Sequence, residues 1–329
     1  MAAGNTVIIK PSEFAEQSAF ALATIINTNF NSKYIKVILG NSKTSEELLR
    51  LKFDKIFFTG STTIGKIIYQ AAAKNLTPVT LELGGKSPCF VLKGCNLQLT
   101  AKRLLWAKLI NAGQTCVAPD YVIIDKEIEQ DFLKLLKIEI KKCYKIENDS
   151  ISRYSQIINL KHYDRVIDLI EEDNVFFGGN RNRKKRFISP TILQNVSFDD
   201  KIMQEEIFGP VIPVIPFTDL NEVISKVKKL PKPLSCYIYS TNKSKINKIL
   251  NEISFGGGAI NDSIMQLSNS NLPFGGVGSS GMGNYHGKAG FSTFSHYKSI
   301  LHKNFLFEPP LKYPPYSSWK LKIIKWLME

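Results

Sequence analysis

Strand-like and helix-like segments alternate along the first part of the chain, and this alternation constrains the fold more than any other feature. A helix is expected over 13–29, because Pro11 and Ser12 form a typical helix start and Ser12 is a suitable cap. Apolar runs typical of strands cover 6–9, 35–39, 55–59 and 79–81. Strands that alternate with helices form a parallel sheet covered by helices. The sequence therefore predicts an α/β fold.

The same pattern continues through the middle of the chain. A helix is predicted over 100–112 from apolar spacing that includes Lys108, with Gly113 as its stop, and a strand over 121–124. Cys116 falls in the loop between these two elements. Further helices are expected near 128–144, 160–172 and 221–229. These elements predict a second α/β unit, and 329 residues are enough for two domains.

The cysteine content and the hydropathy of the chain limit the cellular compartment in which it is expected. The five cysteines are odd in number and form no Cys-x-x-Cys pair, which argues against a disulfide framework and a zinc site. No apolar run approaches the roughly 18 residues of a membrane span, and the first ten residues do not resemble a signal peptide. We expect a cytoplasmic protein without a metal ion.

The formal net charge of +14 has two explanations, an anionic partner or a general drift toward lysine, and the second is favoured because lysine is abundant throughout. Charge is concentrated only at Arg181–Arg186, where a solvated loop is predicted, and in the C-terminal tail. We find no pattern typical of a nucleic-acid partner.

One cysteine lies in a setting that suits chemistry. The stretch NAGQTCVAP places Cys116 behind a helix, among small and polar residues, where backbone N–H groups favour a reactive thiolate. The alternative is a packing role, which is the prediction for the other four cysteines. A Cys–His hydrolase has no local support, because none of the four histidines lies close to Cys116 in the sequence.

Glu82 is a candidate general base. It ends a strand between Leu81 and Leu83, where partial burial would raise the pKa of its carboxyl group. Pairing with Lys86 is nearly as good an explanation from the sequence alone.

Several other charged or glycine-containing segments allow two interpretations each. The turn at Gly60 and Ser61 suits phosphate binding or a plain strand-to-helix connection; it does not fit the P-loop or the G-x-G-x-x-G pattern. Lys10 with Glu13, and Glu205 with Glu206, are best explained in isolation as solvated surface charges. The glycine-rich segments 255–259 and 272–283 predict turns and close backbone crossings.

Taken together, these segments resemble the aldehyde dehydrogenase superfamily along nearly the whole chain. The resemblance rests on the order and spacing of AGNTVIIKPSE, FTGS, LELGGK, GQTC, EEIFGP and LPFGG. The run SGMGNYHGK, followed by FSTFSH, is similar to the class 3 branch that includes fatty aldehyde dehydrogenases. Ala289 and Gly290 depart from the usual residues of that branch.

The resemblance implies roles for individual residues. Cys116 would attack the aldehyde to give a thiohemiacetal, and loss of hydride to NAD or NADP would leave a thioester that water activated by Glu82 hydrolyses. The cofactor-binding residues implied are Lys10 and Glu13 for the adenosine ribose, Gly60 and Ser61 for the pyrophosphate, and Glu206 and Phe208 for the nicotinamide ribose and ring. The substrates implied are medium- or long-chain aldehydes.

The resemblance also implies a domain plan. Residues 1–83 would form the C-terminal part of a Rossmann-type NAD(P)-binding domain, 84–290 the catalytic thiol domain, and 291–329 a C-terminal segment. The family's oxyanion asparagine, first cofactor-domain strands and dimerisation hairpin have no counterpart here, so we expect an N-terminally truncated chain of reduced activity whose full-length form is a homodimer. A basic amphipathic stretch at 319–329 would allow peripheral contact with the cytosolic face of a membrane.

Three other functions stay open at this stage. They are a cofactor-independent thiol esterase that uses Cys116 and Glu82, a non-catalytic remnant that pairs with full-length subunits, and a membrane-surface binding module.

Overall fold

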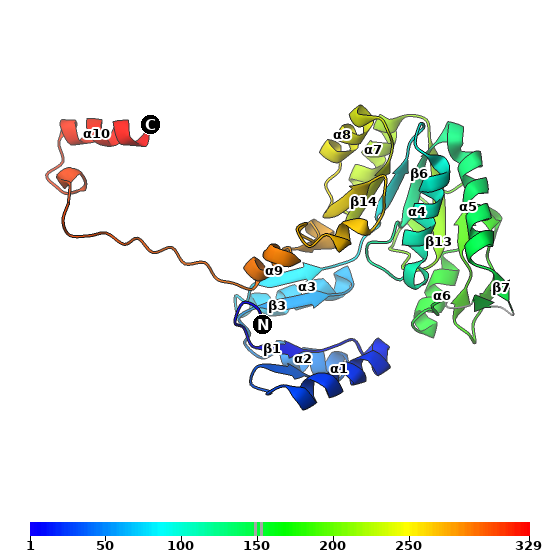
Figure 1. Cartoon of the computed structure of the whole chain (residues 1–329), viewed down its shortest axis with the longest axis horizontal. Helices are drawn as coiled ribbons and strands as arrows, with labels where there is room; N and C mark the ends of the chain where they lie inside the picture. The colour runs from blue at the N-terminus through cyan, green and yellow to red at the C-terminus, as the bar shows by residue number, and fades with distance from the viewer. Residues whose placement is uncertain (148–149, 152–153) are drawn as a thin grey trace. The chain divides into compact units, whose positions relative to one another are not determined.

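A seven-stranded sheet dominates the computed structural model, which describes residues 1–147, 150–151 and 154–329 (Figure 1). Its strand order is β15-β14-β5-β6-β13-β12-β9. The neighbouring strands pair in parallel, except that β9 pairs antiparallel with β12. The strands are β5 (Pro88–Val91), β6 (Tyr121–Asp125), β9 (Val175–Phe177), β12 (Thr191–Leu193), β13 (Val211–Phe217), β14 (Ser235–Tyr239) and β15 (Gly257–Ile260).

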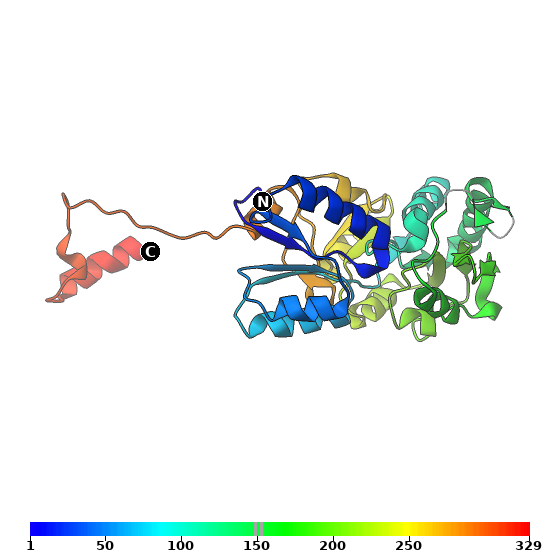
Figure 2. The ribbon, with the colours of Figure 1, turned by 90° about the horizontal axis from the view of Figure 1, so that it is seen from below.

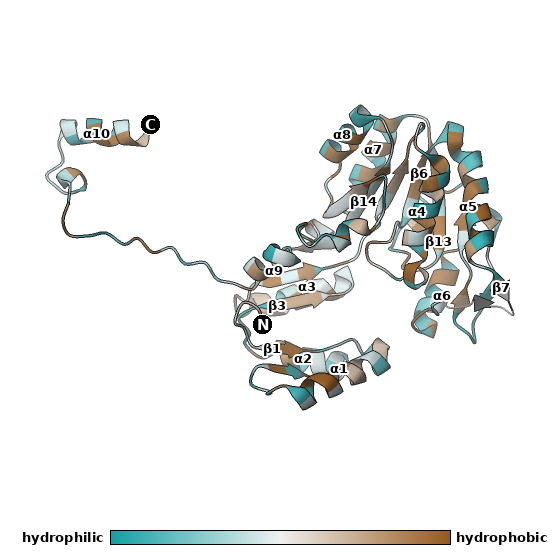
Figure 3. Cartoon of the chain, viewed as in Figure 1, coloured by the Kyte–Doolittle hydropathy of each residue, from teal (hydrophilic) through white to brown (hydrophobic). Residues whose placement is uncertain are grey.

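Helices cover both faces of this sheet, and the strand residues alternate between them. In β5, Phe90 packs in the cluster formed with α6, α7 and α8, whereas Cys89 and Val91 pack in the cluster formed with α4 and α5. Burial on both faces explains why the strands are apolar runs, as is usual for parallel sheets. The helices are α4 (Leu97–Leu109), α5 (Glu129–Cys143), α6 (Leu160–Asp168), α7 (Leu220–Lys229) and α8 (Lys243–Glu252), and Figure 3 shows brown apolar and teal polar segments on each.

Two smaller sheets are formed mainly by the N-terminal part of the chain, and the second also contains one strand from the last third. One is the parallel pair β1 (Val7–Ile9) and β2 (Ile35–Val37); the other has the order β16-β4-β3. Figure 2 shows these parts, in dark and lighter blue, next to each other. The second sheet contains β3 (Ile56–Thr59), β4 (Val79–Glu82) and β16 (Gly281–Met282), and the helices between the strands are α1 (Glu16–Asn29), α2 (Ser42–Leu49) and α3 (Thr62–Ala73).

The glycine-rich C-terminal segment crosses the backbone of β4 closely, as predicted. Gly281 pairs with Glu82 in an antiparallel register, and a Cβ atom at Gly281 would lie 2.2 Å from the Leu81 carbonyl oxygen. A side chain cannot be accommodated at that distance. The segment therefore acts as a third strand that completes the surroundings of Glu82.

The predicted α/β fold is confirmed, with shifts at element ends. The first helix begins with a 3-10 turn over Glu13–Ala15, and the Ser12 hydroxyl accepts a hydrogen bond from the Phe14 N–H as expected for a cap. The helix predicted over 100–112 begins earlier, at Leu97, because Asn96 caps it. The helix predicted over 160–172 ends at Asp168.

The basic segment 181–186 begins in β10 (Arg181–Asn182) and continues as the turn that leads to β11 (Phe187–Ile188), and most of its residues are exposed, in agreement with the predicted solvated loop. Its charges are partly neutralised, because Arg183 pairs with Asp164 at 2.8 Å and Arg181 pairs with Glu172 at 2.8 Å. A short hairpin, β7 (Ile146–Glu147) with β8 (Ser150–Ile151), lies elsewhere in the same unit.

The chain divides into two compact units, Met1–Ser295 and His296–Glu329. The first also contains the short helix α9 (Gly287–Thr293). The second contains the helix α10 (Ser318–Met328), where Lys320 donates hydrogen bonds to the Tyr313 and Pro315 carbonyl oxygens at 2.9 Å each. Among the residues that the structure describes, no helix has the length and apolar character needed to cross a bilayer.

Candidate active site

The loop that carries Cys116 has a rigid, left-handed start. Asn111, Ala112 and Gly113 all have positive φ angles, of 52°, 53° and 77°. A Cβ atom at Gly113 would lie 2.2 Å from the Gly209 carbonyl oxygen, so only glycine fits there. The Cys116 loop is therefore packed directly against the Ile207–Pro210 segment, far away in the sequence.

Hydrogen bonds from one side chain hold the rest of this loop. Gln114 donates to the carbonyl oxygens of Asn111, at 2.9 Å, and Gln156, at 3.0 Å. Its carbonyl oxygen accepts a hydrogen bond from the Ile158 N–H at 2.9 Å. Cys116 lies two residues after this anchored glutamine and is half-buried.

Burial keeps the Cys116 thiol neutral in this structure. Burial, together with the carboxylates of Glu206 and Glu82, raises the pKa of Cys116 to about 11, and only the backbone hydrogen bonds at Cys116 and Val117 oppose the change. The predicted thiolate is thus wrong for this state, because two backbone donors do not offset desolvation and two nearby acids. Attack by sulfur therefore needs a base.

Glu82 can supply that base. It lies at the end of β4 with 3% of its surface exposed, and neither carboxylate oxygen has a hydrogen-bond partner among the described residues. Burial raises the pKa of Glu82 to about 7. The alternative pairing with Lys86 is wrong, because Lys86 donates instead to Asp120 and to the carbonyl oxygens of Ile202 and Glu205.

The two residues of the acidic pair, Glu205 and Glu206, lie in different environments. Glu205 is exposed and pairs with Arg165 at 3.3 Å, in agreement with the predicted solvated charge. For Glu206 that prediction is wrong: burial and the charge of Asp120 raise the pKa of its carboxyl group to about 8, and its Oε2 atom occupies the space beside the Gly84 backbone. Arg165 fixes the segment by donating to the Glu206 carbonyl oxygen at 3.0 Å.

Phe208 follows in a strained conformation. Its φ angle is 48°, unusual for a bulky residue, and its ring is half-buried. Strain of this kind is concentrated at functional sites, which agrees with a role for this segment in ligand contact.

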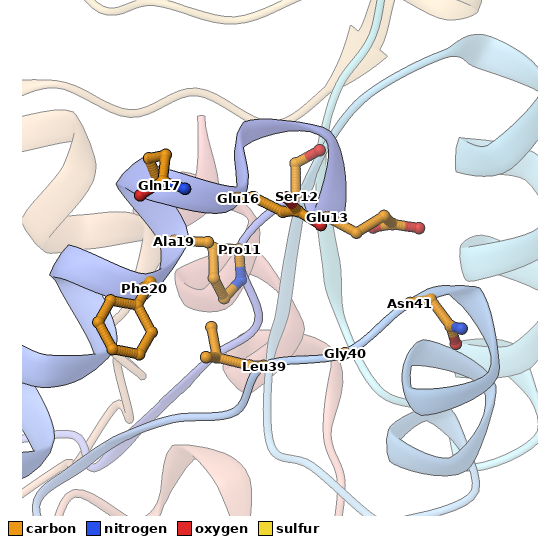
Figure 4. Close-up of a pocket in the computed structure, with 10 residues that line it drawn as sticks. All are labelled: Pro11, Ser12, Glu13, Glu16, Gln17, Ala19, Phe20, Leu39, Gly40 and Asn41. Carbon is orange, nitrogen blue, oxygen red and sulfur yellow. The ribbon is translucent and has the colours of Figure 1, made fainter. Parts of the chain in front are cut away.

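Glu13 is one of the residues that line a surface pocket of about 570 Å³, and Lys10 is its ion-pair partner. Lys10 and Glu13 pair at 2.7 Å, and this hydrogen bond from Lys10 lowers the pKa of Glu13. Figure 4 shows the polar Ser12 and Glu13 near one end of the pocket and the apolar Phe20 and Leu39 along it. The pocket is lined by Pro11, Ser12, Glu13, Glu16, Gln17, Ala19, Phe20, Leu39, Gly40 and Asn41.

Gly60 and Ser61 form the turn from β3 into α3. The Ser61 hydroxyl accepts a hydrogen bond from the Ile64 N–H, and the Gly60 N–H donates to the Glu82 carbonyl oxygen at 3.0 Å. The remaining first-turn N–H groups of α3 have no partner within the helix, which leaves an electropositive end suited to a phosphate. The plain-turn interpretation explains the contacts equally well.

Comparison with known proteins decides the family. The model of the aldehyde dehydrogenase family matches residues 1–300. The chain is 46% identical over 327 residues to 4,4'-diaponeurosporen-aldehyde dehydrogenase of Staphylococcus aureus, covering 99% of this chain and 71% of that protein. The chain belongs to the aldehyde dehydrogenase family.

Further similarities place this aldehyde dehydrogenase near the class 3 branch, as the sequence predicted. It is 46% identical to the dog aldehyde dehydrogenase named dimeric and NADP-preferring, covering 96% of this chain and 70% of that one. It is 44% identical to family 3 member A2 of Pongo abelii, covering 98% and 67%. The solved substrate-bound structure of Staphylococcus aureus AldH is similar with a TM-score of 0.96 at 45% identity, covering 100% and 72%. Enzymes of this family use NAD or NADP.

Two residues of this aldehyde dehydrogenase's site escaped the sequence analysis. Asp120 is buried, pairs with Lys86 and accepts a hydrogen bond from the Ile207 N–H at 3.0 Å. Lys108 is buried on α4 although it is charged. The sequence feature that could have identified Lys108 is its place at an apolar position of a predicted helix. For Asp120, the feature is its place directly before a buried strand.

Tyr285 is a third such residue. Its backbone pairs with Phe274 and its ring packs edge-on against Phe57 at 5.0 Å. Burial, together with the charges of Glu82 and Cys116, raises the pKa of Tyr285 to about 12, so its phenol is electrostatically coupled to both groups. Its position in a glycine-rich crossing, which depends on pairing distant in sequence, gave no local signal.

Proposed function

We propose that this aldehyde dehydrogenase oxidises medium- or long-chain aliphatic aldehydes to carboxylic acids through a covalent intermediate on Cys116. The observation that carries the proposal is the buried, unpartnered carboxylate of Glu82, which acts electrostatically on the Cys116 thiol. A neutral thiol and an acid that titrates near pH 7 form a nucleophile with its base.

The first step needs proton removal from sulfur. Glu82 accepts the thiol proton, directly or through a water molecule, and the sulfur forms a bond to the carbonyl carbon while the carbonyl π electrons move to oxygen. The product is a thiohemiacetal on Cys116. The backbone hydrogen bonds at Cys116 and Val117 favour the anionic sulfur during this step.

NAD or NADP, when bound, supplies the hydride acceptor that turns the thiohemiacetal into a thioester. The chain has a donor set that fits such a group: the Lys10 ammonium and Glu13 carboxylate for the adenosine ribose, and Gly60 with Ser61 at a helix start for the pyrophosphate. Glu206 and Phe208 are proposed for the nicotinamide ribose and ring. The pocket beside Glu13 has an apolar wall suited to a flat base.

Glu82 acts a second time in the final step. It removes a proton from water, the water oxygen bonds to the thioester carbon, and the carbon–sulfur bond breaks to release the acid. The absence of any salt-bridge partner for Glu82 among the described residues supports both roles, because a paired carboxylate would be a weaker base.

The proposal also specifies the length of the aldehyde substrate. The name of the Staphylococcus aureus relative says that it acts on 4,4'-diaponeurosporen-aldehyde, and another relative is a member of family 3. The dog relative is named dimeric. For this chain we likewise propose a homodimer, located in the cytoplasm.

The test is a series of straight-chain aldehydes with NAD and NADP. We expect kcat/KM to increase with chain length, by up to about fourfold per methylene at about 0.8 kcal/mol for each CH₂ buried, until the site is filled. Reduced cofactor and acid are measured together. Values of kcat/KM that do not change with chain length would contradict the substrate class, and an ester-hydrolysis burst without cofactor reduction would favour the esterase.

We also propose that α10 contacts the surface of an anionic membrane. Trp319, Leu321 and Trp326 are exposed on this helix, and Lys322 and Lys325 lie between them in the sequence. Exposed aromatic and basic groups on one short helix suit the boundary of an acidic bilayer.

Deletion of 319–329 is the matching experiment. The fraction of protein that sediments with vesicles of phosphatidylserine and phosphatidylcholine should fall when the segment is deleted. It should also fall when the salt concentration is raised, because salt screens the attraction between the lysines and the anionic lipid. Neutral phosphatidylcholine vesicles are the control. Equal sedimentation of the deleted and intact chains with the anionic vesicles would refute the contact.

A further inference from the structure

Lys86 and Asp120 form a buried ion pair beside the candidate site. The Lys86 ammonium lies 2.5 Å from the Asp120 carboxylate, and the two side chains are 9% and 5% exposed. A buried ion pair is weak evidence for stability, because apolar residues of similar volume often stabilise a protein equally well. The mechanism proposed above assigns this pair no role, so its place in the fold calls for another explanation.

The ion pair binds the peptide groups on both sides of Glu206. Lys86 donates a hydrogen bond to the Glu205 carbonyl oxygen at 2.8 Å. The Oδ2 atom of Asp120 accepts from Lys86, and its Oδ1 atom accepts from the Ile207 N–H at 3.0 Å. Glu205 and Ile207 are the immediate neighbours of Glu206 in the chain. The pair therefore holds the peptide group before Glu206 and the one after it.

A third side chain fixes the second of these peptide groups from its other end. Arg165 donates to the Glu206 carbonyl oxygen at 3.0 Å, while Asp120 accepts the N–H of the same peptide group, that of Ile207. Rotation of this peptide group would break both hydrogen bonds. The backbone at Glu206 is thus held in one orientation, and Phe208 with its positive φ angle follows directly.

The same lysine belongs to the segment that carries Glu82. Lys86 follows Glu82 by four residues, and Gly84 between them contacts the Glu206 side chain. A Cβ atom at Gly84 would lie 1.9 Å from the Glu206 Oε2 atom. The segments 82–86 and 202–208 therefore meet at two points, the side-chain contact at Gly84 and the hydrogen bonds from Lys86.

We propose that Lys86 and Asp120 are a positioning pair that fixes Glu206 and Phe208 for contact with the nicotinamide half of the cofactor. The inference rests on the proposed function, which assigns Glu206 and Phe208 to the nicotinamide ribose and ring. Lys86 and Asp120 act through the peptide groups that they bind. Groups that orient a binding residue in this way improve its affinity because the residue does not have to be ordered on binding. The adenosine half of the cofactor is assigned to other residues and does not depend on the pair.

The test compares binding of NADH and of ADP to the intact chain by isothermal titration calorimetry. ADP lacks the nicotinamide ribose and ring, so it contacts only the residues assigned to the adenosine ribose and pyrophosphate. In Lys86→Met we expect the Kd of NADH to increase by about tenfold, because even a small misplacement of a positioned group has a large cost. The Kd of ADP should not change. An unchanged Kd for NADH, or equal weakening of both ligands, would overturn the proposal.

The matched control is Lys93→Met, at an exposed lysine that pairs with Glu127. It removes a lysine from an ion pair outside the candidate site and should bind both ligands as the wild type does. Selective loss of NADH binding in Lys93→Met would show that the effect is not specific to the buried pair, and would overturn the proposal.

A second variant is needed because loss of a buried charge can destabilise the fold. Asp120→Asn keeps an oxygen that accepts the Ile207 N–H but removes the charge that holds Lys86, so the same selective loss should occur in smaller size. Cys89 and Cys236 are buried in the large sheet, and their alkylation by iodoacetamide reports unfolding. If Lys86→Met exposes them, Asp120→Asn takes its place, and unchanged NADH binding by that variant would overturn the proposal.

Binding by the wild type separates this inference from the proposed function. If the wild type binds NADH no more tightly than ADP, the assignment of Glu206 and Phe208 to the nicotinamide half is wrong, and this inference is overturned with it. If the wild type binds NADH more tightly and both variants keep that preference, this inference alone is overturned. A preference for NADH that the variants lose supports both.

Discussion

Replacement of Cys116 with serine is expected to reduce aldehyde oxidation by roughly a thousandfold or more, because the variant keeps the loop but loses the nucleophile. A serine hydroxyl is a much weaker acid than a thiol, and Glu82, with a pKa of about 7, cannot ionise it appreciably. The measurements are steady-state cofactor reduction and the intact mass of the protein after mixing with aldehyde and cofactor.

The matched control is serine at Cys143, which is exposed and lies at the end of α5. That variant should retain full activity and the covalent adduct. If Cys116→Ser still formed the adduct, or oxidised aldehyde at a rate near that of the wild type, the assignment of the nucleophile would be wrong.

Replacement of Glu82 with glutamine is expected to lower kcat by about a hundredfold to ten thousandfold, the range for loss of a general base. The carboxamide has nearly the same shape but cannot accept a proton. Wild-type activity should rise as pH increases through about 7, because the ionised form of Glu82 is the active one. The variant should lack this rise.

Rapid-mixing kinetics locate the step that Glu82 serves. If its larger role is the hydrolysis of the thioester, Glu82→Gln should give a burst of reduced cofactor equal to the enzyme concentration, followed by a slow phase. Glu252→Gln, at an exposed residue of α8, is the control and should behave as wild type. A rise through pH 7 that persists in Glu82→Gln would assign the titration to another group.

Features of this fold that depend on neighbouring residues were predictable from the sequence. The alternation of elements indicated the parallel sheet, and the helix stop at Gly113 placed Cys116 in a loop. The order of the short motifs indicated the family, and the strand end at Glu82 indicated a carboxylate with an altered pKa. The signals for the loop and for Glu82 lie within a few residues of the feature that they predict, and the order of the motifs can be read directly along the chain.

Features that depend on distant contacts were not predictable in this way. Lys86 had a local partner available in Glu82, but the fold brings Asp120 to it instead. In the sequence, Glu205 and Glu206 look like one surface patch, yet packing against Gly84 leaves the second residue only half-exposed while the first is exposed. Burial of a charge is set by which segments meet, and single-sequence patterns do not contain that information.

The pairing of β16 with β4 determines how late in folding the surroundings of Glu82 are completed. Leu83 donates a hydrogen bond to the Ser280 carbonyl oxygen at 3.0 Å, and Gly281 lies opposite Glu82, so contacts very distant in sequence close the surroundings of this carboxylate. Contacts between residues so far apart in the sequence form late in folding, because closing the long intervening loop has an unfavourable entropy. During synthesis on the ribosome, Cys116 emerges long before β16. Under the proposed mechanism, the nascent chain therefore carries the Cys116 thiol before the surroundings of Glu82 are complete, and we expect reactivity toward aldehydes only after the last third of the first unit has folded.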